Sequence, residues 1–171
     1  NVFELIIVLD KLGAGTHYLF DQVVVGSELI FRGPQGVFTL KQPIENDLFF
    51  ICTGTGIAPF RSMINHIKNE HIPHHNITLV FGCRTKETLL YHEEMKGLQE
   101  SVPGFRYIPT LSRETWEGMS GYVHPVYEEL CTERKPANFF LCGWKGMIDE
   151  AKRRITEMGY DKKDVHVEIY G

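Results

Sequence analysis

The chain has 171 residues, which allows one domain of ordinary size, or one domain that carries a fragment of another. Apolar residues make up 43% and charged residues 23%, a balance typical of folded chains and not of disordered ones. The net charge of −4 excludes a broad basic surface, so we expect no nucleic-acid partner. No apolar run approaches the ~20 residues that cross a bilayer, so we expect no membrane span.

The cysteines are widely spaced and form no CxxC pair. They are Cys52, Cys83, Cys131 and Cys142. This spacing favours reduced thiols over a disulfide framework, and no basic and apolar leader is recognised, so we expect a cytoplasmic protein. The chain begins at Asn1, directly in the strand-like residues 2–9, so we also expect that an upstream segment is missing.

The sequence pattern of residues 1–45 is typical of a β meander. Strands are predicted at 2–9, 28–33 and 37–41, with a short helix that begins near Thr16. Glycine-containing turns separate the later pieces.

From about residue 46, continuous apolar strands alternate with helices. The predicted strands are 48–52, 77–81, 105–111, 139–142 and 165–170, and the predicted helices are 57–69, 91–100, 124–131 and 145–158. Such strands predict an α/β fold with a five-stranded, doubly wound parallel sheet, covered by helices on both faces. Right-handed crossovers then place the ligand crevice at the carboxyl ends of the strands.

A glycine-rich turn follows the first of these strands. It reads Thr53-Gly54-Thr55-Gly56-Ile57-Ala58-Pro59 and leads into the helix predicted at 57–69. Glycines let backbone amides approach a ligand closely, and a helix N-terminus offers unpaired N–H groups to phosphates. Proline is favourable near a helix start because its missing N–H has no intrahelical partner there. The segment is either a phosphate-binding turn or a tight turn without a ligand, and it is not the GxGxxG fingerprint.

A second glycine turn, Cys142-Gly143-Trp144-Lys145-Gly146-Met147, occupies the same position after the strand predicted at 139–142. A thiol at a strand end and helix start can be reactive and can pack against a flat ring. The alternative is a buried structural cysteine.

Two further strand ends carry arginines. Arg84 follows the strand predicted at 77–81, and Ser112-Arg113 follows the strand predicted at 105–111. A guanidinium with a hydroxyl is what a 2′-phosphate needs, although each arginine could equally be a solvated surface residue.

Three histidines, His71, His74 and His75, lie close together beside Pro73. They fall in a connector, and no second ligand group is recognisable elsewhere, so we expect no metal site. No Ser–His–Asp arrangement or pair of carboxylates on one helix supports hydrolytic chemistry.

The whole chain resembles the ferredoxin–NADP reductase family, nearest the plant-type and bacterial flavodoxin-reductase branches. Five motifs carry the resemblance in the family's order: Gly54-Thr55-Gly56-Ile57-Ala58-Pro59, Leu90-Tyr91-His92-Glu93-Glu94, Ser112-Arg113, Cys142-Gly143-Trp144-Lys145-Gly146-Met147 and Val167-Glu168-Ile169-Tyr170. The resemblance implies a ferredoxin reductase-like NAD(P)-binding domain at 46–171. The remnant of an antiparallel FAD-binding β-barrel, its C-terminal part, would precede it at 1–45.

The resemblance also implies roles for individual residues. The nucleotide-binding set is Gly54, Thr55, Gly56, Ile57, Pro59, Gly143 and Met147, with Ser112, Arg113 and Tyr122 on the 2′-phosphate and adenine side. Arg84, which the resemblance does not include, is expected to supply a second charge there if its side chain turns toward the same crevice. The catalytic set is Cys142 against the nicotinamide, Glu168 in hydride or proton handling, and Tyr170 stacked on the flavin.

The N-terminal part matches the family in two places and departs from it in one. Gly13-Ala14-Gly15-Thr16 resembles the segment that meets the FAD pyrophosphate through Thr16, and Gly33-Pro34-Gln35-Gly36-Val37-Phe38 resembles the closing turn of the barrel. The RxYS segment that holds the flavin is absent, and we expect it in a missing N-terminal flavin-domain segment. The family's Lys-x-Tyr is also incomplete, because Ser120-Gly121-Tyr122 stands in its place.

We therefore expect a flavin-dependent oxidoreductase that transfers hydride from NADPH to FAD and passes electrons to a ferredoxin or a flavodoxin. One alternative is an NADH-linked reductase component of an oxygenase. Another is a non-catalytic nucleotide-binding or docking module.

Overall fold

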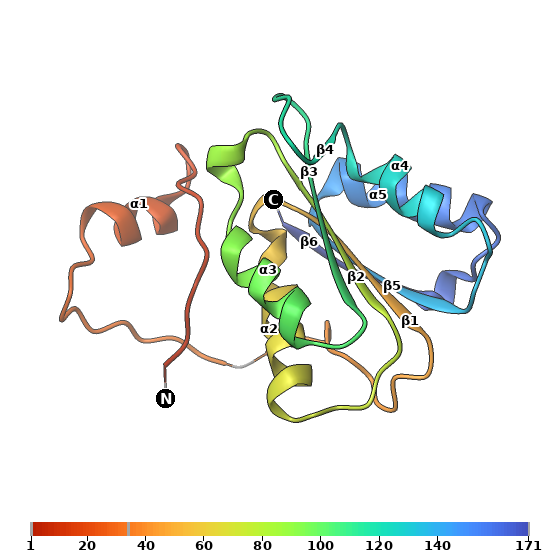
Figure 1. Ribbon diagram of the computed structural model, residues 1–171. Coiled ribbons are helices and arrows are strands. Elements are labelled where there is room, and N and C mark those ends of the chain that lie inside the picture. The colour runs from red at the N-terminus through yellow and green to blue at the C-terminus, as the bar shows by residue number, and fades with distance from the viewer. Residues whose placement is uncertain (1, 34, 171) are drawn as a thin grey trace. The chain divides into compact units, whose positions relative to one another are not determined.

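The computed structural model describes residues 2–33 and 35–169, together with the backbone of Tyr170 (Figure 1). The chain divides into two compact units, Asn1–Val37 and Phe38–Gly171. The helices and strands of the second unit, in chain order, are β1 (Asp47–Thr53), α2 (Ile57–Asn69), β2 (Ile77–Cys83), α3 (His92–Ser101), β3 (Phe105–Leu111), β4 (Met119–Ser120), α4 (Val123–Leu130), β5 (Ala137–Trp144), α5 (Lys145–Glu157) and β6 (Val165–Tyr170). Short 3-10 turns are η1 (Gly54–Gly56), η2 (Lys86–Thr88) and η3 (Lys162–Asp164).

The second unit is built on one parallel sheet with the strand order β4-β3-β2-β1-β5-β6. The order reverses on either side of β1, which is the hallmark of a doubly wound sheet. Figure 1 shows α2 and α3 on one face of this sheet and α4 and α5 on the other. The predicted α/β fold is therefore confirmed.

The sheet has six strands, and the prediction of five is wrong in this respect. The additional strand, β4, contains only Met119 and Ser120, which pair with Thr110 and Leu111 of β3. Two residues cannot show a period-2 pattern, so a strand of this length leaves no signal in the sequence.

Burial on both faces explains why the strands are continuously apolar. On one face, Phe50 of β1 stacks on Phe60 of α2, with 4.7 Å between the ring centroids. On the other, Tyr127 of α4 and Ile148 of α5 are fully buried in a cluster with residues of the central strands. Because β1 meets helices on both faces, it needs apolar side chains at odd and even positions alike.

The first unit contains the helix α1 (Ala14–Asp21), which confirms the helix predicted near Thr16. The strands predicted at 2–9, 28–33 and 37–41 are not formed, and residues 2–33 and 35–46 contain no strand. The expected barrel remnant is thus not observed as β structure. A strand requires a neighbour that accepts its hydrogen bonds, and here apolar side chains such as Val2 and Ile30 lie fully exposed. Pro34 of the expected closing turn lies outside the described residues.

A buried histidine between α4 and α5 should make the stability of the fold depend on pH. His124 is 6% exposed, and its Nδ1 lies 3.0 Å from the Tyr127 hydroxyl. Burial is the largest influence on His124 and lowers its pKa. The Glu150 carboxylate, whose Oε2 lies 3.6 Å from the His124 Nε2, raises this pKa by a smaller amount. The charges of Glu128, Arg153 and Arg154 have weaker effects.

The unfolded chain therefore takes up a proton at this histidine more readily than the folded chain does, and stability falls as the pH drops below the ordinary value of 6.5. We expect the free energy of unfolding, measured with urea, to decrease between about pH 7.5 and about pH 5.5. The decrease should be smaller in His124→Gln. Identical decreases in the two proteins would contradict this assignment.

Candidate functional site

The carboxyl ends of the parallel strands bring the two predicted glycine turns together. Cys52 of β1 is the register partner of Cys142 on β5, and Cys142 is in turn the partner of Glu168 on β6. The η1 turn leaves β1, and α5 leaves β5, at the same edge of the sheet. The pairing of β1 with β5 is set by the tertiary structure, because the 83 residues 54–136 separate the two strands in the sequence.

The contact between the two turns requires glycine at both positions. A Cβ on Gly56 would collide with the carbonyl oxygen of Cys142, and a Cβ on Gly143 would collide with Thr53. Gly143 also has a φ of +142°, which L side chains rarely adopt. The two turns therefore pack backbone against backbone at this edge of the sheet.

A thiol and a carboxylate meet beside these turns. The Cys142 Sγ donates toward Glu168 Oε2 across 3.9 Å, from β5 to the neighbouring β6. Cys142 is fully buried and Glu168 is half-buried. This places a buried thiol and a partly solvated carboxylate side by side, an arrangement that can hold or move a proton.

A second group of predicted residues lies at the carboxyl ends of β2, β3 and β4. The Ser112 N–H donates to the carbonyl oxygen of Cys83 (2.9 Å), and the Arg113 N–H donates to the carbonyl oxygen of Arg84 (3.0 Å). Both arginines are exposed, as is Tyr122, which immediately precedes α4. The fold thus brings Arg84, Arg113 and Tyr122 to neighbouring strand ends, although 38 residues separate the first from the last in numbering.

The remaining predicted contacts have different surroundings. Ile57 and Met147 are both buried. The Thr16 hydroxyl, in the first unit, accepts from the Asp10 N–H at 3.1 Å and lies 3.0 Å from the Gly13 carbonyl oxygen. The side chain of Tyr170 lies outside the described part of the chain.

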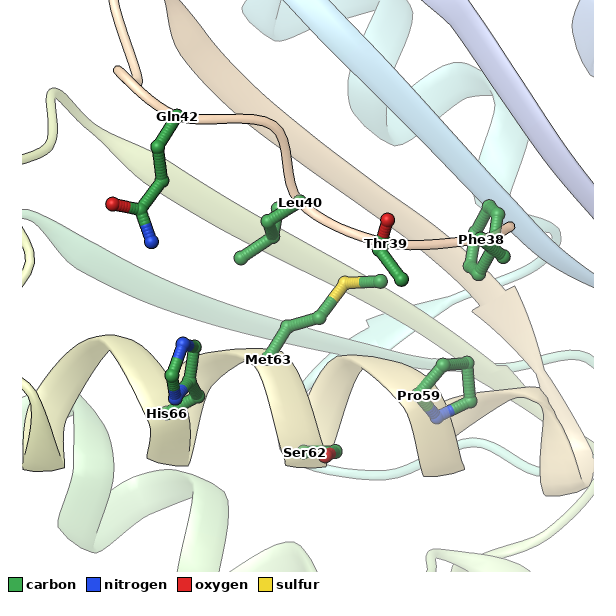
Figure 2. Close-up of a pocket in the computed structure, with 8 residues that line it drawn as sticks. All are labelled: Phe38, Thr39, Leu40, Gln42, Pro59, Ser62, Met63 and His66. Atoms are coloured by element: carbon green, nitrogen blue, oxygen red, sulfur yellow. The ribbon is translucent and has the colours of Figure 1, made fainter. Parts of the chain in front are cut away.

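Pro59 lines a groove of about 310 Å³ between α2 and the segment that precedes β1 (Figure 2). The other lining residues are Phe38, Thr39, Leu40, Gln42, Ser62, Met63 and His66. Figure 2 shows the Pro59 ring on α2, on the side of the helix that faces Phe38. Pro59 lies in the first turn of α2, directly after the glycine turn, where a missing N–H costs no intrahelical bond. Its position therefore favours the start of the helix at the end of the glycine turn.

An ion pair that the sequence reasoning missed joins α2 to the start of α3. Arg61 Nε lies 2.9 and 2.8 Å from the two carboxylate oxygens of Glu94, and the Arg61 guanidinium sits 4.3 Å from the centroid of the Tyr91 ring. Asn65 donates to the same carboxylate at 3.1 Å. The motif that contains Tyr91 and Glu94 was recognisable in the sequence, but its partner Arg61 is 33 residues from Glu94.

Among the described residues, no group of three or more histidine, cysteine or acidic side chains is arranged to hold a metal ion. His71, His74 and His75 lie in the connector between α2 and β2. No helix within the described ranges is both long and apolar enough to cross a membrane.

The family model and two curated relatives that match this chain are named as oxidoreductases or electron-transfer proteins. Residues 50–153 match the family model described as the oxidoreductase NAD-binding domain. Ferredoxin–NADP reductase B of Sorangium cellulosum is 33% identical over 98% of this chain and 72% of its own length. The anthranilate 1,2-dioxygenase electron transfer component of Acinetobacter baylyi is 29% identical over 98% of this chain, which spans only 48% of that relative.

Solved structures share the fold. The FAD/NAD-binding domain of a nitric oxide dioxygenase from Vibrio cholerae matches with a TM-score of 0.82 at 22% identity, over 93% of this chain and 65% of that one. A ferredoxin–NADP⁺ reductase from Neisseria gonorrhoeae, solved with bound FAD and NADP, matches with a TM-score of 0.73 at 20% identity, over 94% and 71% of the two chains. From the family model and the Sorangium relative together, this chain belongs to the oxidoreductase NAD-binding domain family and, within it, to the ferredoxin–NADP reductase family.

Proposed function

We propose that this chain is the nucleotide-binding part of a flavin-dependent oxidoreductase, which transfers hydride from NADPH to FAD and passes electrons to a ferredoxin or a flavodoxin. The observation that carries the proposal is the meeting of two glycine turns with the Cys142–Glu168 pair at one edge of a parallel sheet. Family membership and the names of the relatives support it. In this proposal residues 1–45 are the end of a FAD-binding domain, residues 46–171 are the NAD(P)-binding domain, and a further flavin-domain segment precedes Asn1.

The glycine turns fit a nicotinamide nucleotide. The α2 helix begins at Ile57 with no acidic residue in its first turn, so its positive dipole end would favour the pyrophosphate, although the Ile57 N–H itself donates to carbonyl oxygens of the η1 turn. A Cβ at Gly54 would meet nothing within 4 Å, so the space above this turn is open. Gly54, Thr55 and Gly56 would therefore bind the pyrophosphate, and Gly143 would leave room for the ring beside Cys142.

The Cys142–Glu168 pair would position the nicotinamide and control a nearby proton. The buried thiol would contact the flat ring, and the half-buried Glu168 carboxylate would accept the thiol hydrogen bond and hold a proton at its Oε2. FAD, when bound, supplies the exchange between two-electron and one-electron transfer. On the flavin side, Thr16 and Tyr170 are the proposed contacts, and the Thr16 hydroxyl would be oriented by its bond from Asp10.

The preference for NADPH should depend on Arg113. Its guanidinium is exposed beside Ser112, and a charge-assisted contact to phosphate contributes about 1.5–3 kcal/mol, roughly ten- to a hundredfold in affinity. We expect Arg113→Ala to weaken NADPH binding by about tenfold and to leave NADH binding unchanged. Titration of both nucleotides by calorimetry measures this. Equal losses for both would show that Arg113 contacts a part that they share.

A second candidate function, an NADH-linked reductase component of an oxygenase, is favoured by the acidic residues near Arg113. Glu114 follows Arg113 directly, Glu117 lies in the same loop, and Ser120 stands where the family pattern has lysine. The oxygenase-associated relative from Acinetobacter adds support. A wild-type protein that binds NADH as tightly as NADPH would favour this candidate.

The decisive experiment is anaerobic addition of NADPH to the flavin-loaded protein, followed by absorbance. Rapid loss of the oxidised flavin band is expected, and reduced ferredoxin or flavodoxin should appear when either is supplied. A protein that binds nucleotide but reduces no flavin would instead be a docking module. We also propose a cytoplasmic location, because the four cysteines are widely spaced and form no CxxC pair, a usage that favours reduced thiols.

A further inference from the structure

We propose that Lys86 is a further cationic contact for the 2′-phosphate, beside Arg84 and Arg113, and that Glu117 holds its side chain until a nucleotide binds. This inference rests on the proposed function and names a residue that decides its nucleotide specificity. The loop from Ser112 to Tyr122 contains no lysine and a single arginine, Arg113, so any further cation at this strand end comes from another segment. Lys86 lies in η2, two residues after Arg84.

The turn that carries Lys86 is joined to the loop that carries Arg113. The Lys86 N–H donates to Glu114 Oε2 at 2.7 Å, and the Arg113 N–H donates to the Arg84 carbonyl oxygen at 3.0 Å. Thr85 and Thr88 bond each other's backbone in a capping box, which holds the turn itself. These bonds place Lys86 beside Arg84 and Arg113, at the strand ends where the 2′-phosphate is proposed to bind.

The side chain of Lys86 forms an ion pair that is exposed to solvent. Its Nζ lies 2.9 Å from Glu117 Oε1, and the two side chains are 55% and 71% exposed. Glu117 raises the pKa of Lys86, so the amine remains charged at neutral pH. An ion pair that exposed is screened by water and contributes little, so a phosphate dianion can take the amine from Glu117.

The loop does not depend on this ion pair for its shape. The Trp116 indole N–H donates to the Met119 carbonyl oxygen at 2.7 Å, and Gly121 N–H donates to the Leu111 carbonyl oxygen at 2.7 Å. Loss of the Lys86–Glu117 pair should therefore leave the loop in place. Because Glu117 competes with the phosphate for Lys86, the two residues should have opposite effects on binding.

The test is calorimetric titration of the 171-residue chain with 2′,5′-ADP, which carries the 2′-phosphate, and with 5′-AMP, which does not. We expect Lys86→Met to weaken 2′,5′-ADP about three- to tenfold, and Glu117→Gln to strengthen it about two- to fivefold. Binding of 5′-AMP should change in neither variant. A matched control is the exposed pair Lys135–Glu133, 2.7 Å apart at the amino edge of β5, where Lys135→Met should change neither titration.

Unchanged 2′,5′-ADP binding in Lys86→Met, or weaker binding in Glu117→Gln, would overturn the role of Lys86 while leaving the nucleotide site intact. A wild-type chain that binds neither probe would overturn the nucleotide site itself, and this inference with it. The role of Lys86 would also be overturned if Lys86→Met weakened the binding of 5′-AMP and of 2′,5′-ADP equally. Lys86 would then contact a part that the two nucleotides share.

Discussion

Glu168→Gln should slow the reduction of the flavin by NADPH about 10- to 100-fold in the flavin-loaded protein, with less than about a threefold change in the Kd of NADPH. The substitution keeps the shape of the side chain and removes its ability to take a proton. A group that acts mainly in the transition state affects the rate and not the affinity. Stopped-flow absorbance measures the rate, and titration measures the Kd.

Cys142→Ala should act in the same direction, because it removes the thiol that lies 3.9 Å from Glu168 Oε2. Effects in the double variant should be smaller than the product of the single effects, since the two groups interact. Asp164→Asn is the matched control: Asp164 directly precedes β6 at the opposite end of the strand from the glycine turns. Unchanged reduction rates in both single variants would rule out the catalytic assignment.

Gly56→Ala should lower the free energy of unfolding by about 1–3 kcal/mol, which is a large share of the stability of an ordinary domain. The added methyl group would collide with the Cys142 carbonyl oxygen, a backbone atom that cannot rotate away. Relief requires that β1 and β5 move apart, although they pair in register from Asp47–Ala137 to Cys52–Cys142. Urea unfolding measures the change.

Gly97→Ala is the control for this prediction. Gly97 lies in α3, is exposed, and a Cβ there would meet nothing within 4 Å. Alanine is the better helix former by roughly 0.5–1 kcal/mol, so this variant should be slightly more stable than the wild type. A Gly56→Ala protein as stable as the wild type would show that the two turns do not pack as tightly as the structure indicates.

The sequence by itself determined the helices of the second unit and all of its strands except β4. Helices α2 and α5 begin at the residues predicted for them, because apolar spacing and the preceding glycines are local signals. The position of the glycine turns at strand ends could also be read locally. From there, a parallel sheet with its ligand edge at the carboxyl ends follows from general rules of chain topology.

Local sequence patterns predicted strands in the first unit that are not formed, and they did not predict β4. Residues 2–9 have the composition of a strand, but strand formation depends on a partner whose groups complete the ladder, and residues 2–33 and 35–46 form none. The two residues of β4 pair only because β3 ends beside them. In both cases the deciding hydrogen bonds are made between segments and not within one.

Only the tertiary structure decided which residues act together in the site. The Cys142 thiol meets Glu168 across 26 positions, Arg61 meets Glu94 across 33, and Lys86 meets Glu117 across 31. Each residue type was visible in the sequence, but pairing depends on strand order and on the exits of the loops. Contacts over such separations are set by how the sheet is assembled, and spacing along the chain carries no record of them.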